Sequence, residues 1–145
     1  VDRIETSAAW RALDRAGAEL GIVATAYERA HGAWSRLVQA AALAMFHPSS
    51  AVYSCPLAMT DGAARCLEVH GGGDPALGDV LARLVTRDPA RFWTSGQWMT
   101  ERTGGSDVSG TSTVAEPAED GTWALHGAKW FTSATTSQVA MTLAR

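Results

Sequence analysis

The sequence is poor in the residues that mark several common classes of protein. Only two cysteines, Cys55 and Cys66, occur among 145 residues, which excludes the dense cysteine framework of a disulfide-stapled domain. A zinc site needs clustered cysteine and histidine ligands, and the four histidines are scattered along the chain. We therefore expect both cysteines to be small buried residues on a helix.

Basic charge and long apolar runs are also scarce. The chain carries 12 lysines and arginines against 15 acidic residues, a net charge of −3, so it lacks the basic footprint of a nucleic-acid-binding domain. The longest apolar run, 37–46, is alanine-rich and too short to span a membrane. Hydrophobic residues make up 46% and charged residues 19%, which excludes a disordered or collagen-like chain.

The first 95 residues have helical periodicity. Apolar residues recur at the three-, four- and seven-residue steps of an amphipathic helix. Ser7 and Asp74 are expected to act as N-caps, Ser49 or Ser50 to cap a third helix, and Pro48 to end the helix before it. The predicted helices cover residues 10–20, 34–45, 51–69 and 75–85.

After Gly96 the composition shifts to threonine, valine, serine, tryptophan and glycine. Short runs of strand type appear, and Asp120-Gly121 between two of them predicts a hairpin. Gly127 predicts another tight turn or bulge. We expect an α+β chain, with a helical segment followed by an antiparallel β domain. The predicted strands cover residues 97–100, 108–116, 123–126, 129–133 and 139–144.

The stretch 98–107 joins a strand end to a glycine-rich turn. Adjacent glycines let the backbone approach a ligand closely, and successive turn amides form an anion-binding nest. Such a turn suits a phosphate or pyrophosphate, with the Ser106 hydroxyl as a further donor. Taken alone, the spacing favours a plainer interpretation, a hairpin in which Asp107 is a turn residue.

The stretch 127–133 places two large aromatic residues side by side. On a strand, Trp130 and Phe131 would point to opposite faces, so one fills the core and the other lies against a ligand. An indole beside the Thr132 hydroxyl suits the face and edge of a flat heterocycle. Taken alone, this stretch favours two core aromatics and a solvated threonine.

Together the two stretches resemble the middle domain of the acyl-CoA dehydrogenases. The residues that carry the resemblance are WMTE at 98–101, GSD at 105–107 and LHGAKWFT at 125–132. Upstream, CPLAMTDGAA at 55–64 and FWTSGQW at 92–98 resemble one branch of that family, the AidB-like or adaptive-response branch. The resemblance covers nearly the whole chain.

The resemblance implies a partial helical N-terminal region, 1–95, and the start of an antiparallel β-barrel-like middle domain, 96–145. It also implies an FAD site between the middle domain and a C-terminal helical bundle. Met99 and Thr100 match the pair at the flavin pyrimidine edge, and Ser106 also lies near the entry of acyl-CoA. The cofactor-binding residues implied in this way are Met99, Thr100, Gly105, Ser106, Trp130, Phe131 and Thr132.

The implied reaction is the α,β-dehydrogenation of an acyl-CoA thioester, a step of fatty acid metabolism. The family's catalytic base comes from the C-terminal helical region, so no residue of this chain is assigned catalysis, and Glu101 and Asp107 match loop positions only. We therefore expect a fragment that does not turn over acyl-CoA. Arg102 and Lys129 are expected to be solvated charges, with Lys129 at a strand edge.

The resemblance further implies an electron-transfer flavoprotein or similar acceptor, a homotetramer, and a cytoplasmic location if the source is bacterial. No nucleic acid or membrane partner is expected from these residues. The alternative is an AidB-like flavoprotein with a binding or stress-response role and little dehydrogenase activity. A third interpretation is a scaffold that binds no flavin.

Overall fold

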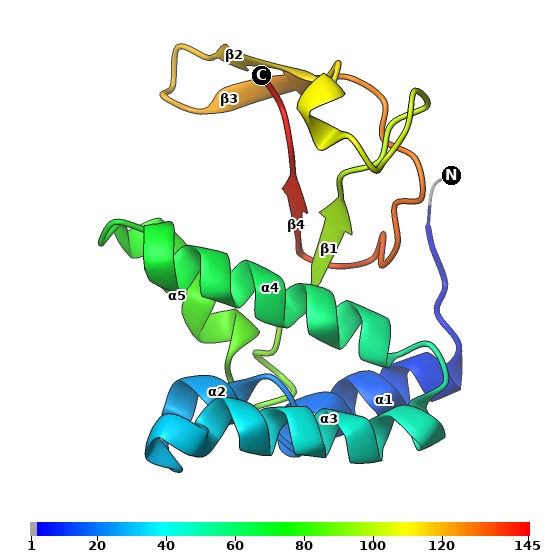
Figure 1. Ribbon diagram of the computed structural model, residues 1–145, viewed down its shortest axis with the longest axis vertical. Helices are drawn as coiled ribbons and strands as arrows, with labels where there is room; N and C mark the ends of the chain where they lie inside the picture. Colours follow the sequence, from blue (N-terminus) through cyan, green and yellow to red (C-terminus); the bar gives the residue numbers. More distant parts are fainter. Residues whose placement is uncertain (1–2) are drawn as a thin grey trace.

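The computed structural model describes residues 3–145 and confirms the α+β class. Figure 1 shows the helices packed together at one end and the strands at the other, with β1 leading from one to the other. The helices are α1 (Ala8–Glu19), α2 (Ala24–Glu28), α3 (Ser35–Ser50), α4 (Ser54–His70) and α5 (Pro75–Leu84), with 3-10 turns at Gly32–Trp34 and Val108–Gly110. The strands are β1 (Ser95–Trp98), β2 (Val114–Pro117), β3 (Trp123–His126) and β4 (Val139–Thr142).

The helix starts follow the predicted caps at two positions. The Ser7 hydroxyl accepts a hydrogen bond from the Trp10 amide at 3.0 Å, which satisfies one of the free donors at the start of α1. Asp74 does the same for the Ala76 amide at 2.8 Å, with Pro75 at the first position of α5. Both caps are confirmed.

The boundary between α3 and α4 was predicted wrongly. Helix α3 continues through Pro48 to Ser50, so the hydrogen bond that the proline removes in the last turn does not end the helix. Ser50 is therefore the buried last residue of α3 and not a cap of α4, which starts at Ser54 without a side-chain cap. The five-residue helix α2 was not predicted, since it is too short to show a periodicity.

The strands form two pairs, and only one of them is antiparallel. β2 pairs with β3 in the predicted hairpin, with Val114 opposite His126. β1 pairs with β4 in parallel, with Ser95 opposite Val139, so the expectation of antiparallel pairing throughout was wrong. The two pairs do not join into a closed barrel within residues 3–145.

Two predicted strands are largely irregular. Residues 108–110 form a 3-10 turn, and only the end of the predicted strand 108–116 becomes β2. Residues 129–133 form a loop with a single bridge between Lys129 and Glu101. Tertiary context thus overrides the strand propensity of both segments, which lie largely at the surface.

The core lies in two clusters. Tyr53, Leu57 and Phe92 belong to a first cluster within the helices, whereas Leu84 belongs to a second cluster that also contacts β4. The Thr60 hydroxyl stabilises the junction between α4 and β1. It accepts a hydrogen bond from the Ser95 amide at 2.9 Å, and both residues are fully buried. The strands are thus attached to α4 by apolar packing and by a satisfied buried hydrogen bond.

The two cysteines are free and lie on α4, as expected for helical positions. Cys55, however, is exposed and Cys66 is half-buried, so the expectation that both are buried was wrong. Cys55 lies in the first turn of α4. Among the residues that the structure describes, no helix has the length and apolarity needed to cross a membrane.

Leu57 offers a test of the helical core. Its side chain is 1% exposed and packs against Gly17, where an added Cβ would come within 3.1 Å of the leucine methyl groups. Leu57→Ala should lower the free energy of unfolding by about 2–5 kcal/mol, because it removes buried methyl groups and leaves a cavity. Urea unfolding measures the change. The matched control is Leu37→Ala at a 61% exposed position, where the loss should stay below about 0.5 kcal/mol; equal losses would contradict the packing described.

Candidate cofactor site

The structure brings the two motif stretches together at the end of β1. The Trp130 amide donates to the Thr100 carbonyl at 2.9 Å, and Glu101 forms a bridge with Lys129 next to it. Residues about thirty positions apart in the sequence are thus neighbours just beyond the end of β1. The stretches 98–107 and 127–133 are therefore parts of one surface.

A buried ion pair fastens this contact. Lys129 Nζ donates to Glu101 Oε1 at 2.8 Å, and the two side chains are only 10% and 4% exposed. The remaining lone pairs of the carboxylate accept from the segment before β2: from the Thr113 amide at 3.0 Å and hydroxyl at 2.7 Å, and from the Ser112 amide at 2.7 Å. The hydroxyls of Thr111 and Ser112 also donate to it. Glu101 thus ties together three segments.

This environment fixes the charge of Glu101. Hydrogen bonds from Lys129, and then from Ser112, Thr111 and Thr113, hold the pKa of the Glu101 carboxyl far below its ordinary value. The Glu101 side chain is therefore held as a carboxylate, and these donors occupy its oxygens. The expectation that Lys129 is a solvated surface charge was wrong.

Sequence reasoning missed this pair because each residue was considered alone. The available signal was the TST run at 111–113, which supplies three hydroxyls, together with the only lysine of the chain. Thr111 and Thr113 turn inward, as their alternation predicted, but they turn toward a carboxylate. Alternation of residues along an extended segment indicates which side chains face inward, but it does not indicate which groups they contact there.

The glycine turn follows directly from Glu101. The backbone groups of Glu101 and Gly104 exchange hydrogen bonds of 3.1 and 3.0 Å, and Gly104 has a φ of +144°, which favours glycine. At Gly105 an added Cβ would lie 2.7 Å from the Thr100 hydroxyl, so the turn lies directly against that residue. Asp107 accepts from the Ser109 amide at 3.1 Å and starts the next turn, which confirms it as a turn residue.

Several donors of this surface are uncommitted. Within residues 3–145, the amides of Gly105, Ser106 and Asp107 donate to no protein acceptor. The hydroxyls of Thr100, Ser106 and Thr132 likewise have no partner among the described residues. Gly105, Ser106 and Asp107 are exposed, and no unpartnered side-chain oxygen is buried among the described residues, so these groups are accessible from solvent.

Both aromatic residues of the second stretch lie at the surface. Trp130 is 49% and Phe131 is 81% exposed, and their ring centroids are 6.4 Å apart in an edge contact. The expectation that one of them fills the core was wrong, because strand alternation does not apply to a loop in which Phe131 has a φ of +55°. Trp98 steadies this loop by donating from its indole to the Ser133 carbonyl at 3.0 Å.

The lowered pKa of Glu101 predicts a pH dependence. Its pKa is lower in the folded chain than in the unfolded chain, where it is about 4.3. The stability that it contributes is therefore complete above that value and is lost as the pH falls through the folded-state pKa. The difference in unfolding free energy between the wild-type chain and Glu101→Gln should be constant above about pH 5 and shrink steadily below about pH 4.

Urea unfolding at a series of pH values measures this difference. Glu116→Gln is the matched control, because the Glu116 side chain is 67% exposed and lies on β2 outside the network. That variant should track the wild-type chain throughout the acid range. A Glu101→Gln chain that is as stable as the wild type near neutral pH would contradict the described role of the carboxylate.

Comparisons with known proteins agree with the resemblance. The family model described as "Adaptive response protein AidB N-terminal domain" matches residues 1–88, and that for "Acyl-CoA dehydrogenase, middle domain" matches residues 96–145. Acyl-CoA dehydrogenase family member 11 of Caenorhabditis elegans is 43% identical over 150 residues, covering 100% of this chain and 24% of that protein. Putative acyl-CoA dehydrogenase AidB of Escherichia coli K12 is 36% identical over 98 residues, covering 63% of this chain and 18% of that protein.

Solved structures give the same result. The apo-form of Bd2924 superposes with a TM-score of 0.93 at 62% identity, covering 100% of this chain and 30% of the other. Caenorhabditis elegans ACDH-11 in complex with C11-CoA superposes with a TM-score of 0.94 at 43% identity, covering 100% and 25%. The chain therefore spans about a quarter of the length of these relatives. It belongs to the acyl-CoA dehydrogenase family, as an AidB-like member.

Proposed function

We propose that this chain supplies one face of the FAD site of a flavin-dependent acyl-CoA dehydrogenase. The single observation that carries the proposal is the hydrogen bond from the Trp130 amide to the Thr100 carbonyl at 2.9 Å. It joins a turn with uncommitted amides to a half-exposed indole. Free amides suit a pyrophosphate, and an exposed indole suits a flat ring system.

The residues present fit this cofactor. Its pyrophosphate needs donors at a turn where the backbone is open, and at Gly105 and Ser106 both amides are free among the described residues. The ring edge needs polar groups, which the Thr100 and Thr132 hydroxyls provide. The ring face needs an apolar cover, and Trp130 and Phe131 together leave such a surface exposed.

The role of the chain is to bind and orient the cofactor. In this proposal Met99 and Thr100 hold the pyrimidine edge, and Gly105 and Ser106 hold the pyrophosphate. Trp130, Phe131 and Thr132 lie beside the isoalloxazine ring, where the indole excludes water from one side. When bound, the flavin supplies the hydride acceptor for the α,β-dehydrogenation of an acyl thioester.

Acyl-CoA is the substrate that we propose for the whole protein, with Ser106 near its entry. The structure of the relative ACDH-11 has been solved in complex with C11-CoA, and the match covers 100% of this chain. We assign removal of the α-proton to neither Glu101 nor Asp107, because Lys129 and the segment 111–113 occupy the Glu101 carboxylate and Ser109 occupies that of Asp107. We propose that the remainder of the protein supplies the catalytic base. We also propose that the whole protein is a tetramer and passes electrons to an electron-transfer flavoprotein or a similar acceptor.

Trp130 provides the test of flavin binding. FAD added to the wild-type chain should quench tryptophan fluorescence saturably with one site per chain. Trp130→Leu should raise the dissociation constant about five- to tenfold, because it removes the aromatic surface beside the ring. Trp123→Leu is the matched control, since Trp123 is 62% exposed on β3, outside the two motif stretches, and its loss should leave the affinity within about twofold.

The possible outcomes separate the functional alternatives. No saturable change on FAD addition would contradict the proposal and favour a scaffold. Saturable FAD binding by the whole protein, without flavin reduction by any acyl-CoA, would support the site and favour the binding or stress-response role over dehydrogenation. Equal effects of Trp130→Leu and Trp123→Leu would contradict the position assigned to the ring.

A further inference from the structure

A pocket lies in the helical region, far along the chain from the glycine turn. It has a volume of about 280 Å³ and opens between the α2–α3 connection on one side and α4 on the other. This volume is close to the lower end of the range for small-ligand pockets. The lining residues are Ala26, Arg29, Gly32, Ala33, Ser35, Arg36, Arg65 and Glu68.

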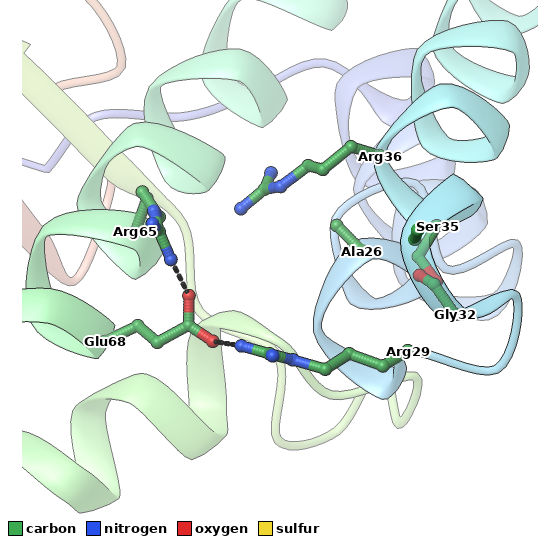
Figure 2. Close-up of a pocket in the computed structure, with 8 residues that line it drawn as sticks. Ala26, Arg29, Gly32, Ser35, Arg36, Arg65 and Glu68 are labelled. Atoms are coloured by element: carbon green, nitrogen blue, oxygen red, sulfur yellow. Dashed lines mark hydrogen bonds and ion pairs between the residues drawn. The ribbon is translucent and has the colours of Figure 1, made fainter.

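Three arginines from three elements meet at this pocket. Figure 2 shows Arg36, from α3, and Arg65, from α4, directing their guanidinium groups into the same space. Arg29, which follows α2, reaches Glu68 below the other two arginines in that view. Glu68 and Asp61 neutralise two of the three positive charges, so an anion between Arg36 and Arg65 would reduce the repulsion that remains.

The carboxylates that pair with these arginines use few of their donors. Glu68 accepts from Arg29 Nη2 at 2.7 Å and from Arg65 Nη1, and Asp61 accepts from Arg36 Nη1 at 2.6 Å. Among the described residues, each guanidinium therefore bonds through a single nitrogen. A guanidinium carries five donors, so most of them stay available.

A structural ion pair in the same region looks different. Glu28 takes Arg87 in a two-pronged pair, from Nε at 2.6 Å and from Nη2 at 2.9 Å, and Thr25 accepts from Arg87 as well. That guanidinium is committed to holding α2 against the segment after α5. The pocket arginines are positioned by their partners without being saturated by them.

Arg36 is also held in place before any ligand arrives. Its guanidinium lies 4.7 Å from the ring centroid of Tyr27, and its Nη1 also bonds Gln39 at 3.0 Å. The Tyr27 hydroxyl in turn donates to Asp61 at 2.8 Å. An arginine that is already ordered loses less side-chain entropy when it binds an anion.

The charge balance favours an anionic ligand. Three arginines against Glu68 and Asp61 leave a net charge of +1 at the pocket, in a chain whose net charge is −3. Gly32, Ala33 and Ser35 place the N-terminal end of the 16-residue helix α3 on the same wall, which adds the positive end of its dipole.

We propose that this pocket binds the phosphate group of a small phosphorylated molecule or free phosphate. The planar donor fork of arginine matches phosphate oxygens bidentately, and Arg36 and Arg65 face the same space from opposite walls. Both side chains are about half exposed, so a ligand reaches them from solvent. The site is independent of the proposed flavin surface and uses none of its residues.

The test is calorimetric titration of the wild-type chain with inorganic phosphate, adenosine monophosphate and adenosine at constant ionic strength. Inorganic phosphate should bind saturably at one site, and adenosine, which has no phosphate, should not bind. If adenosine monophosphate binds more tightly than inorganic phosphate, the ligand is a phosphorylated small molecule; if it binds more weakly, the ligand is free phosphate. In both cases the phosphate site is supported.

Arg65→Gln and Arg15→Gln form a matched pair of variants. Each removes one positive charge from an exposed arginine that pairs with a glutamate on its own helix, but Arg15 lies on α1 away from the pocket. Arg65→Gln should weaken phosphate binding about tenfold and Arg15→Gln by less than about twofold.

An NMR titration of the wild-type chain locates the site. The amide shifts that phosphate causes should concentrate at Ala33 and Ser35. The absence of saturable binding, equal weakening by the two variants, or shifts elsewhere would overturn the proposal.

Discussion

The candidate cofactor surface depends on the buried pair between Glu101 and Lys129. Removing either charge would leave the other in a site that is almost closed to solvent, which is far less favourable than the intact pair. The carboxylate also organises the segment 111–113 by accepting from its amides and hydroxyls. The glycine turn, the aromatic loop and the approach to β2 thus share one anchor, although none of these segments is held by extended strand pairing.

The helical region gives this anchor a fixed base. Thr60 on α4 receives the Ser95 amide in a fully buried hydrogen bond at the first residue of β1. β4 lies beside β1 and contributes Val139 and Met141 to the same apolar cluster as Leu84. The short strands of the surface are therefore stable because they pack on helices, since isolated pairs of strands are marginal in water. Glu101, three residues beyond the end of β1, is positioned by this chain of contacts.

Much of this organisation could be predicted from the sequence. The α+β class, the hairpin at Asp120-Gly121, the caps of Ser7 and Asp74, and the meeting of the two motif stretches all followed from local chemistry or from the family resemblance. The predictions that failed depended on contacts between residues that lie far apart in the sequence. The parallel pairing of β1 with β4 joins residues more than forty positions apart, and Phe131 is exposed because its loop takes a left-handed turn. Lys129 looked like a surface charge because nothing in its neighbourhood along the chain shows that Glu101 lies opposite.

The most direct measurement is the FAD dissociation constant of Lys129→Met, compared with the wild-type chain at a temperature where circular dichroism shows both to be folded. Lys129 does not belong to the residues proposed to touch the cofactor, so any effect must act through the turn that Glu101 holds. Our account predicts an affinity at least about tenfold weaker, because the two halves of the surface lose their connection. Arg102→Met, which removes an exposed charge next to Glu101, should leave the affinity unchanged. A Lys129→Met chain that is folded and binds FAD as tightly as the wild type would contradict the central claim.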